Sequence, residues 1–194
     1  MNKVRAYHFT NGWQLRDGRK LVAGHEYRHN DILLMCRSGL HASIHLMDAL
    51  KYANGSVLSL VDCYGTVIYD TDKLVCTRRR VVDSHDVGSE LRLFACWCIR
   101  RIWNLLNDKR SKKVVIIAEQ YALGNATVDE LYAARAAAMD AARDAAMDAA
   151  WAAAIDAARD AARAAQRNEF QRVINCIFAG EVAYPEVKKV NWRE

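Results

Sequence analysis

The stretch Ala133–Ala165 reads AARAAAMDAARDAAMDAAWAAAIDAARDAARAA, in which 20 of the 33 residues are alanine. Alanine has the highest helix propensity of any residue, and neither glycine nor proline interrupts the stretch. At a rise of 1.5 Å per residue, a continuous helix of this length would extend roughly 50 Å. The residues before it have a quite different composition, so the stretch separates a helical part of the chain from an α+β part.

The bounds of the long helix follow from signals at its two ends. Thr127 is followed three residues later by Glu130, a capping-box pattern that marks a helix start. No helix breaker occurs before Gly180. The pattern therefore predicts one helix over 127–179 and a tail over 180–194.

The alanine stretch is built from four-residue repeats such as AMDA and ARDA, and this period does not encode a coiled coil. On a helix with 3.6 residues per turn a four-residue repeat drifts by about 40°, whereas a heptad pattern keeps its apolar residues on one seam. The large side chains therefore spiral round the helix. Two interpretations stay open: the helix braces the domain or a dimer, or it is a docking arm that meets a target through Met147, Trp151, Arg159 and Arg163.

Residues 1–86 predict an α+β domain with a mostly antiparallel sheet and one packed helix. The helix is expected over Ile44–Ala53, with Ser43 as its N-cap. Strand patterns between turn residues occur at Val4–Thr10, Asp31–Cys36, Val57–Cys63, Thr66–Tyr69 and Lys73–Val82. We expect the third and fourth of these strands to pair around a turn at Tyr64-Gly65.

Residues 87–126 predict a helical hairpin. Apolar residues at helical spacing favour one helix over Ser89–Leu106. The second segment, Val114–Leu123, fits a helix or a buried strand, and the helix is favoured because Glu119 and Gln120 lie inside it.

The composition, 52% hydrophobic and 26% charged residues, is that of an ordinary globular chain. No apolar run approaches the roughly 20 residues that a membrane span requires. The N-terminus lacks the apolar core of a signal peptide, so a leader is not expected. The six cysteines form no CxxC motif or paired framework, which favours reduced thiols. Together these observations predict a cytoplasmic protein that has no membrane partner.

The net charge of +5 is unevenly distributed. Five aspartates and four arginines leave the alanine stretch at −1, so the remainder of the chain carries +6. The positive residues cluster at Arg78-Arg79-Arg80, Arg100-Arg101 and Lys109–Lys113. Such clusters are either contacts for phosphates or an acidic protein surface, or solvated turns and helix ends.

Two histidine pairs have the spacing that places two imidazoles on one helix face: His25 with His29, and His41 with His45. No carboxylate or thiolate stands at a supporting spacing, and the expected turns interrupt both pairs. Ser43 lies outside any Gly-x-Ser-x-Gly nucleophile motif, and the chain has no glycine-rich phosphate loop. The sequence therefore predicts no metal site and assigns no catalytic residue.

Three motifs follow one another in the first half of the chain: Tyr7-His8-Phe9-Thr10, Gly39-Leu40-His41-Ala42-Ser43 and Asp48-Ala49-Leu50-Lys51-Tyr52-Ala53. Together with the basic strand ending at Arg78-Arg79-Arg80 and the alanine-rich helix, this series resembles an uncharacterised group of phage and prophage proteins. The resemblance covers most of the chain. It implies a phage origin more than a particular activity.

The same motifs have a more distant resemblance to ADP-ribosyltransferase-like folds, in which a strand reading Tyr-His-Gly-Thr contacts the ribose of NAD. This resemblance implies a nucleotide site, with NAD as the implied cofactor, formed by His8, Thr10, Ser43 and Tyr52. Such enzymes generally use a glutamate late in the domain, and no glutamate occurs here between Glu26 and Glu90. A repurposed or inactive fold is therefore favoured over an active transferase.

Three functions are expected, in order of preference. The first is a phage-encoded accessory protein that binds and inhibits or diverts a host protein or nucleoprotein complex in the host cytoplasm, for example as an anti-CRISPR-type anti-defence protein. The second is an ADP-ribosyltransferase-like protein, active or degenerate, that binds NAD or another nucleotide. The third is a nucleic-acid-binding protein that uses the basic clusters. A macromolecular target would meet Arg78, Arg79, Arg80, Met147, Trp151, Arg159 and Arg163, and the oligomeric state stays open.

Overall fold

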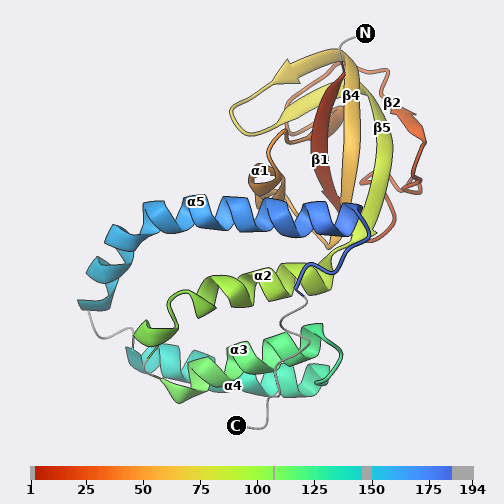
Figure 1. The fold of residues 1–194 in the computed structure, drawn as a ribbon. Coiled ribbons are helices and arrows are strands. Elements are labelled where there is room, and N and C mark those ends of the chain that lie inside the picture. The colour runs from red at the N-terminus through yellow and green to blue at the C-terminus, as the bar shows by residue number, and fades with distance from the viewer. Residues whose placement is uncertain (1–2, 107, 146–149, 185–194) are drawn as a thin grey trace. The chain divides into compact units, whose positions relative to one another are not determined.

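A computed structural model describes residues 3–106, 108–145 and 150–184, with their side chains except those of 105 and 139–162. The chain divides into two compact units, Met1–Gly88 and Ser89–Glu194. The first unit holds all the described strands and the second is helical (Figure 1). This confirms the predicted α+β class, with a mostly antiparallel sheet first and a helical half after it.

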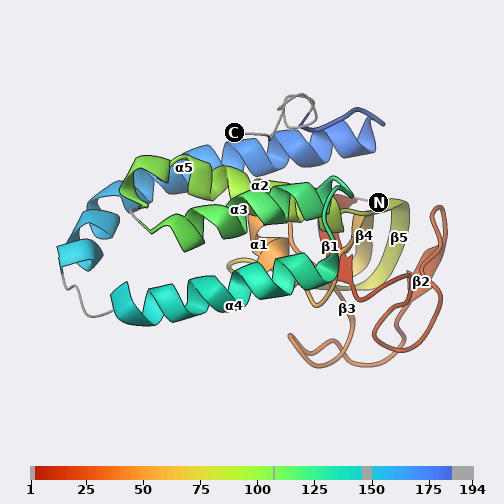
Figure 2. The ribbon, with the colours of Figure 1, turned by 90° about the horizontal axis from the view of Figure 1, so that it is seen from below.

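The first unit consists of an antiparallel sheet of five strands and one short helix. Four strands lie in the order β1 (Val4–Thr10), β4 (Val57–Tyr69), β5 (Leu74–Asp86) and β2 (Glu26–Arg28). The three-residue strand β3 (Leu40–Ala42) also pairs with β5, and the helix α1 (Leu46–Lys51) follows it. The long strands β4 and β5 lie side by side, with β1 next to β4 (Figure 2).

The sheet closes on itself through the residue that follows β3. The backbone N–H of Tyr7 donates to the carbonyl of Ser43 at 2.8 Å, and the N–H of Ser43 donates back to Tyr7 at 2.9 Å. Because β3 pairs with β5 and β5 with β4, the strands β1, β4, β5 and β3 form a closed ring. This bridge pairs the edge of β1 at Tyr7, and the ring has an inward-facing side. The buried core side chains of this ring include Ala6, Ala42, Val57, Val61, Cys63, Leu74, Cys76 and Val81.

Two irregularities bend the long strands. The pairing register of β4 and β5 shifts between Leu60 and Val61, and again between Tyr64 and Val67. At the second shift Gly65 has a φ of 80°, and a Cβ there would lie 2.3 Å from Thr77 Oγ1. Such bulges bend a strand and increase its twist. The predicted turn at Tyr64-Gly65 is therefore wrong, since both expected strands belong to β4 and pair with β5.

Two further local predictions in the first unit are wrong. Residues 31–36 form an irregular loop instead of a buried strand, and Ile32 is 79% exposed. The loop is held instead by paired backbone hydrogen bonds between Leu34 and Ser38. Ser43 does not cap the helix, because its backbone closes the ring. The N-cap of α1 is His45, which makes no side-chain cap hydrogen bond.

The second unit begins with α2 (Gly88–Arg100), the short 3-10 helix η1 (Trp103–Leu105) and α3 (Lys109–Ala122). The helix α3 agrees with the favoured prediction of a helix over Val114–Leu123. The guanidinium of Arg100 on α2 donates two hydrogen bonds, of 2.9 and 2.6 Å, to the largely buried Glu119 on α3. The Cys96 thiol donates to the carbonyl of Val115 at 3.7 Å. These contacts hold α2 against α3.

The alanine-rich segment forms two helices, α4 (Val128–Ala145) and α5 (Ala150–Phe178), where a single helix over 127–179 was expected. Residues 146–149 lie outside the described residues. The helix α4 packs beside α3, whereas Phe170 near the end of α5 stacks on Phe94 of α2, with ring centroids 4.7 Å apart. In a straight helix Leu131 and Phe170 would be roughly 60 Å apart, about three times the length of α2. One straight helix does not fit these contacts.

The expected start of α4 is confirmed. The side chain of Glu130 accepts from the backbone N–H of Thr127 at 2.7 Å, and the Thr127 hydroxyl accepts from the N–H of Glu130 at 3.2 Å. This is the reciprocal capping box. Of the tail over 180–194, residues up to Tyr184 are described, and Ala183 and Tyr184 pack with Leu93 and Val173.

All six cysteines are free thiols. Among the described residues, no helix has both the length and the apolar composition needed to cross a membrane.

Candidate functional site

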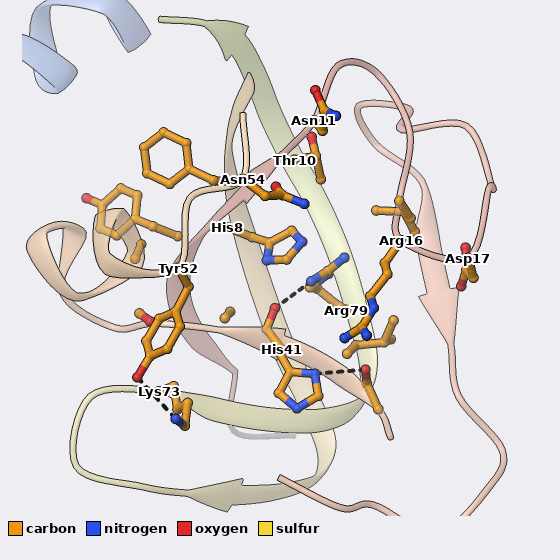
Figure 3. A pocket seen from close by; sticks show the side chains of 18 of the residues that line it. His8, Thr10, Asn11, Arg16, Asp17, His41, Tyr52, Asn54, Lys73 and Arg79 are labelled. Atoms are coloured by element: carbon orange, nitrogen blue, oxygen red, sulfur yellow. Dashed lines mark hydrogen bonds between the residues drawn. The ribbon is translucent and has the colours of Figure 1, made fainter. Parts of the chain in front are cut away.

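A cavity of about 420 Å³ opens within the first unit. Its walls come from β1, the loop over residues 11–17, the segment from 36 to 43, α1 and β5. All four residues predicted for a nucleotide site line this cavity: His8, Thr10, Ser43 and Tyr52. Figure 3 labels three of them, His8, Thr10 and Tyr52. The ring closure explains why, because the hydrogen-bonded pair of Tyr7 and Ser43 brings the first and second sequence motifs together.

Arg79 lies at the centre of the cavity (Figure 3). The sequence had placed it only in a basic cluster and not in a nucleotide site. Alternate residues of β1 face the same side of the sheet, so His8 and Thr10 face inward with the core residue Ala6. Arg79 reaches the same side from β5 and is only 2% exposed. Its Nη1 donates to the carbonyl of His41 at 2.6 Å, but its Nε has no hydrogen-bond partner.

No carboxylate pairs with Arg79 among the residues that the structure describes. Two thiols lie near Arg79, and the hydrogen bond with Cys63, together with the charge of Arg79, lowers the pKa of Cys76. Cys76 donates its thiol hydrogen to backbone carbonyls, and a hydrogen bond with Cys76, together with burial, raises the pKa of Cys63. Burial lowers the pKa of Arg79 from its usual value. A buried guanidinium without a countercharge is costly, so this arrangement is unusual in a site with no ligand role.

The two histidines of the cavity differ in what their ring nitrogens do. His41 is fully occupied, because its Nε2 accepts the N–H of Cys36 at 2.9 Å while its Nδ1 lies 3.1 Å from the carbonyl of Gly39. This pair of bonds requires the neutral tautomer with the proton on Nδ1. Burial lowers the pKa of His41, which favours the same neutral form.

His8, by contrast, has no hydrogen-bond partner in the described part of the chain. Burial, with the nearby charge of Arg79 and the ring of His41, holds the pKa of His8 well below its ordinary range. At neutral pH His8 is therefore an uncharged imidazole with one donor and one acceptor. Figure 3 shows its ring directed toward the Arg79 guanidinium.

Two more cations line the cavity. Arg16 reaches in from the loop after β1 (Figure 3). The positive charges of Arg79, Arg16 and Lys73 all lower the pKa of His41. Lys73 donates to the Tyr52 hydroxyl at 3.1 Å and lies over its ring, with 4.7 Å from Nζ to the ring centroid. The Tyr52 hydroxyl in turn donates to Asp72 at 2.8 Å. The cavity is thus rich in positive charge, and its own lining carboxylate, Asp17, is bound to Arg19 at 2.6 Å.

The three consecutive arginines predicted as an interaction patch have three different environments. Arg78 donates to both oxygens of Glu26 and lies 4.8 Å over the ring of Tyr64. Arg79 is buried in the cavity, and Arg80 is exposed. These residues therefore do not present one basic surface.

Of the remaining interaction residues, Met147 lies outside the described residues, and so do the side chains of Trp151 and Arg159. Arg163 is exposed on α5. The residues that line the cavity all belong to the first unit.

The histidines of the first pair, His25 and His29, make separate contacts. His25 packs edge-on against Tyr27, and His29 shares a hydrogen bond of 2.9 Å with the Ser38 hydroxyl. Among the described residues no group of three or more metal-ligating side chains comes together.

The glutamate that the transferase resemblance calls for has no counterpart here. The described residues that line the cavity include no glutamate. Glu26 is engaged by Arg78 and Tyr64, while Glu90 and Glu119 belong to the second unit. What the cavity offers is a buried cation, two neutral imidazoles and hydroxyl groups. No family model matches the chain, and comparison with curated proteins and with solved structures finds no similar protein.

Proposed function

We propose that the first unit binds a small anionic ligand in this cavity, with Arg79 as the main contact. The observation that carries the proposal is the buried guanidinium of Arg79, which lines the cavity, has no partner for its Nε and is paired with no carboxylate among the described residues. A guanidinium donates two parallel hydrogen bonds to a carboxylate or phosphate. A bound anion would supply the missing countercharge.

The rest of the cavity supports the same function. Its volume, about 420 Å³, falls within the range typical of sites for small ligands. Arg16 and Lys73 add positive charge at the walls. The resemblance to ADP-ribosyltransferase-like folds makes nucleotides, NAD among them, the first ligands to test, with His8, Thr10, Ser43 and Tyr52 as neighbours of the bound molecule.

Calorimetry on the full chain tests this proposal. Inorganic phosphate, AMP and NAD are titrated into the wild type and into Arg79→Gln, with Arg80→Gln as the matched control one residue away on the exposed side. We expect Arg79→Gln to weaken anion binding about 10- to 100-fold, the loss of one charged hydrogen-bonding group. Arg80→Gln should bind like the wild type. Absence of binding heat with every anion, or equal losses in both variants, would contradict the proposal.

The two macromolecular functions stay predictions. A phage accessory protein that inhibits a host target predicts a stable partner in a pull-down, and deletion of residues 133–165 would abolish capture if the alanine-rich helices dock. Nucleic-acid binding predicts an affinity that falls steeply with salt. The separate environments of Arg78, Arg79 and Arg80 do not favour nucleic-acid binding.

A further inference from the structure

The cavity contains polar groups that an anion alone would leave unused. His8 and Ser43 both line it, and neither side chain has a hydrogen-bond partner among the described residues. Thr10 is different, because its hydroxyl already donates to the carbonyl of Gly12 at 2.8 Å. A ligand that fits this cavity must therefore bring partners for an imidazole and a hydroxyl as well as for a guanidinium.

The chemistry of these groups distinguishes two parts of the ligand. Arg79 is only a donor, and it suits an anion. A neutral imidazole and a serine hydroxyl each donate and accept, so both suit hydroxyl groups, which also donate and accept. His8 stays neutral next to Arg79, which keeps its acceptor nitrogen available.

The number of cations indicates the charge of the anion. Arg79 and Arg16 both lie close enough to His41 to influence its titration, and Figure 3 shows both guanidinium groups inside the cavity. A phosphate monoester carries about −1.5 to −2 at neutral pH, whereas a carboxylate or a phosphodiester carries one charge. Two converging guanidinium groups therefore match a phosphate monoester best.

We infer that the ligand is a phosphate monoester of a sugar-sized polyol, with its phosphate against Arg79 and Arg16 and its hydroxyl groups against His8 and Ser43. This inference rests on the anion-binding function proposed above. It adds the class of ligand and the end of the molecule that each side chain meets.

Four probes separate the parts of the inference in calorimetry on the full chain: ribose 5-phosphate, ribose, inorganic phosphate and gluconate, a hydroxylated carboxylate. We expect ribose 5-phosphate to bind at least about 10-fold more tightly than inorganic phosphate, which lacks hydroxyl groups on a sugar, or gluconate, whose carboxylate carries only one charge. Ribose without a phosphate should give no measurable binding.

Variants assign the two ends. His8→Ala and Ser43→Ala should each weaken ribose 5-phosphate about 10-fold and inorganic phosphate by much less. Arg79→Gln should weaken both, and Arg80→Gln should weaken neither. An ¹H–¹⁵N spectrum of each variant establishes that it is folded before its affinity is compared.

The outcomes distinguish this inference from the function on which it rests. If inorganic phosphate binds through Arg79 but ribose 5-phosphate binds no more tightly, the ligand class is wrong and anion binding stands. Equal affinity for gluconate and ribose 5-phosphate also overturns the monoester assignment. If no anion binds to the folded protein, the proposed function fails and the inference fails with it.

Discussion

Arg79 carries a charge that the described part of the fold does not neutralise. Since burying an uncompensated cation destabilises a protein, removing the charge at constant shape is often neutral or stabilising. We expect the unfolding free energy of Arg79→Gln, measured by urea denaturation, to equal or exceed that of the wild type. A ligand-binding role predicts this combination of lost binding and retained stability. A loss of about 3 kcal/mol would instead show that Arg79 has a structural role.

The ionisation of Glu26 makes the stability of the folded protein depend on pH. Hydrogen bonds from Tyr64 and Arg78 lower the pKa of Glu26 to about 2, below its ordinary value of 4.5. A carboxyl group with a depressed pKa in the folded state stabilises that state above its unfolded pKa, and this contribution is lost as the pH falls from about 4.5 toward 2.

We therefore expect Glu26→Gln to lower the melting temperature at pH 7 and to lower it by much less near pH 2.5. Melting temperatures of the two proteins across this range test it, with Glu90→Gln as a control outside the sheet. A difference that does not shrink on acidification would contradict the assigned linkage.

At the residue scale, the four residues that the ADP-ribosyltransferase resemblance implied, His8, Thr10, Ser43 and Tyr52, line one cavity. That they bind a nucleotide stays a prediction. Arg79 could not be singled out from its neighbours, because strict alternation along β5 is broken by the register shift between Tyr64 and Val67. That shift decides which of the three arginines faces inward, and it arises from pairing with β4 rather than from local sequence.

At the scale of elements, Gly65 lies at the second register shift between β4 and β5. Its positive φ is a conformation that glycine adopts without strain, and Thr77 Oγ1 occupies the space of a side chain there. Gly12 has a similar φ of 70° but open space within 4 Å. The two glycines therefore separate the cost of the backbone conformation from the cost of the collision.

We expect Gly12→Ala to destabilise the protein by about 1 kcal/mol, the cost of a left-handed alanine. Gly65→Ala should cost about 1–3 kcal/mol more, since Thr77 must move as well. Urea denaturation of both variants tests this. Equal losses would mean that the bulge accommodates a side chain, and that the close approach of β4 and β5 at Gly65 is not what fixes the bend.

Elements whose signals are local were predicted well, and those that depend on distant contacts were not. The capping box at Thr127 and Glu130 is local and forms as expected. A turn was also expected at Tyr64-Gly65, yet these residues lie inside a strand, because pairing with β5 continues past them. Residues 127–179 contain no helix breaker, so nothing in their sequence indicated the division into α4 and α5.

At the scale of the whole molecule, the boundary between the two units has a functional consequence. The cavity is lined by residues 7–79 only, and the ring of β1, β4, β5 and β3 is complete within the first unit. The expected boundary after residue 86 lies close to the observed one after Gly88. In many proteins, a chain as long as residues 1–88 buries enough apolar surface to fold alone.

We therefore expect a fragment of residues 1–88 to unfold cooperatively in urea and to bind inorganic phosphate within about threefold of the full chain, since the phosphate site and the core lie in the same unit. Arg79→Gln in the fragment is the matched control, and its binding should be lost as in the full chain. A folded fragment that fails to bind would mean that residues 89–194 complete the site. An unfolded fragment would show that the helical unit is needed for the stability of the sheet, and binding would then have to be assigned to the whole chain.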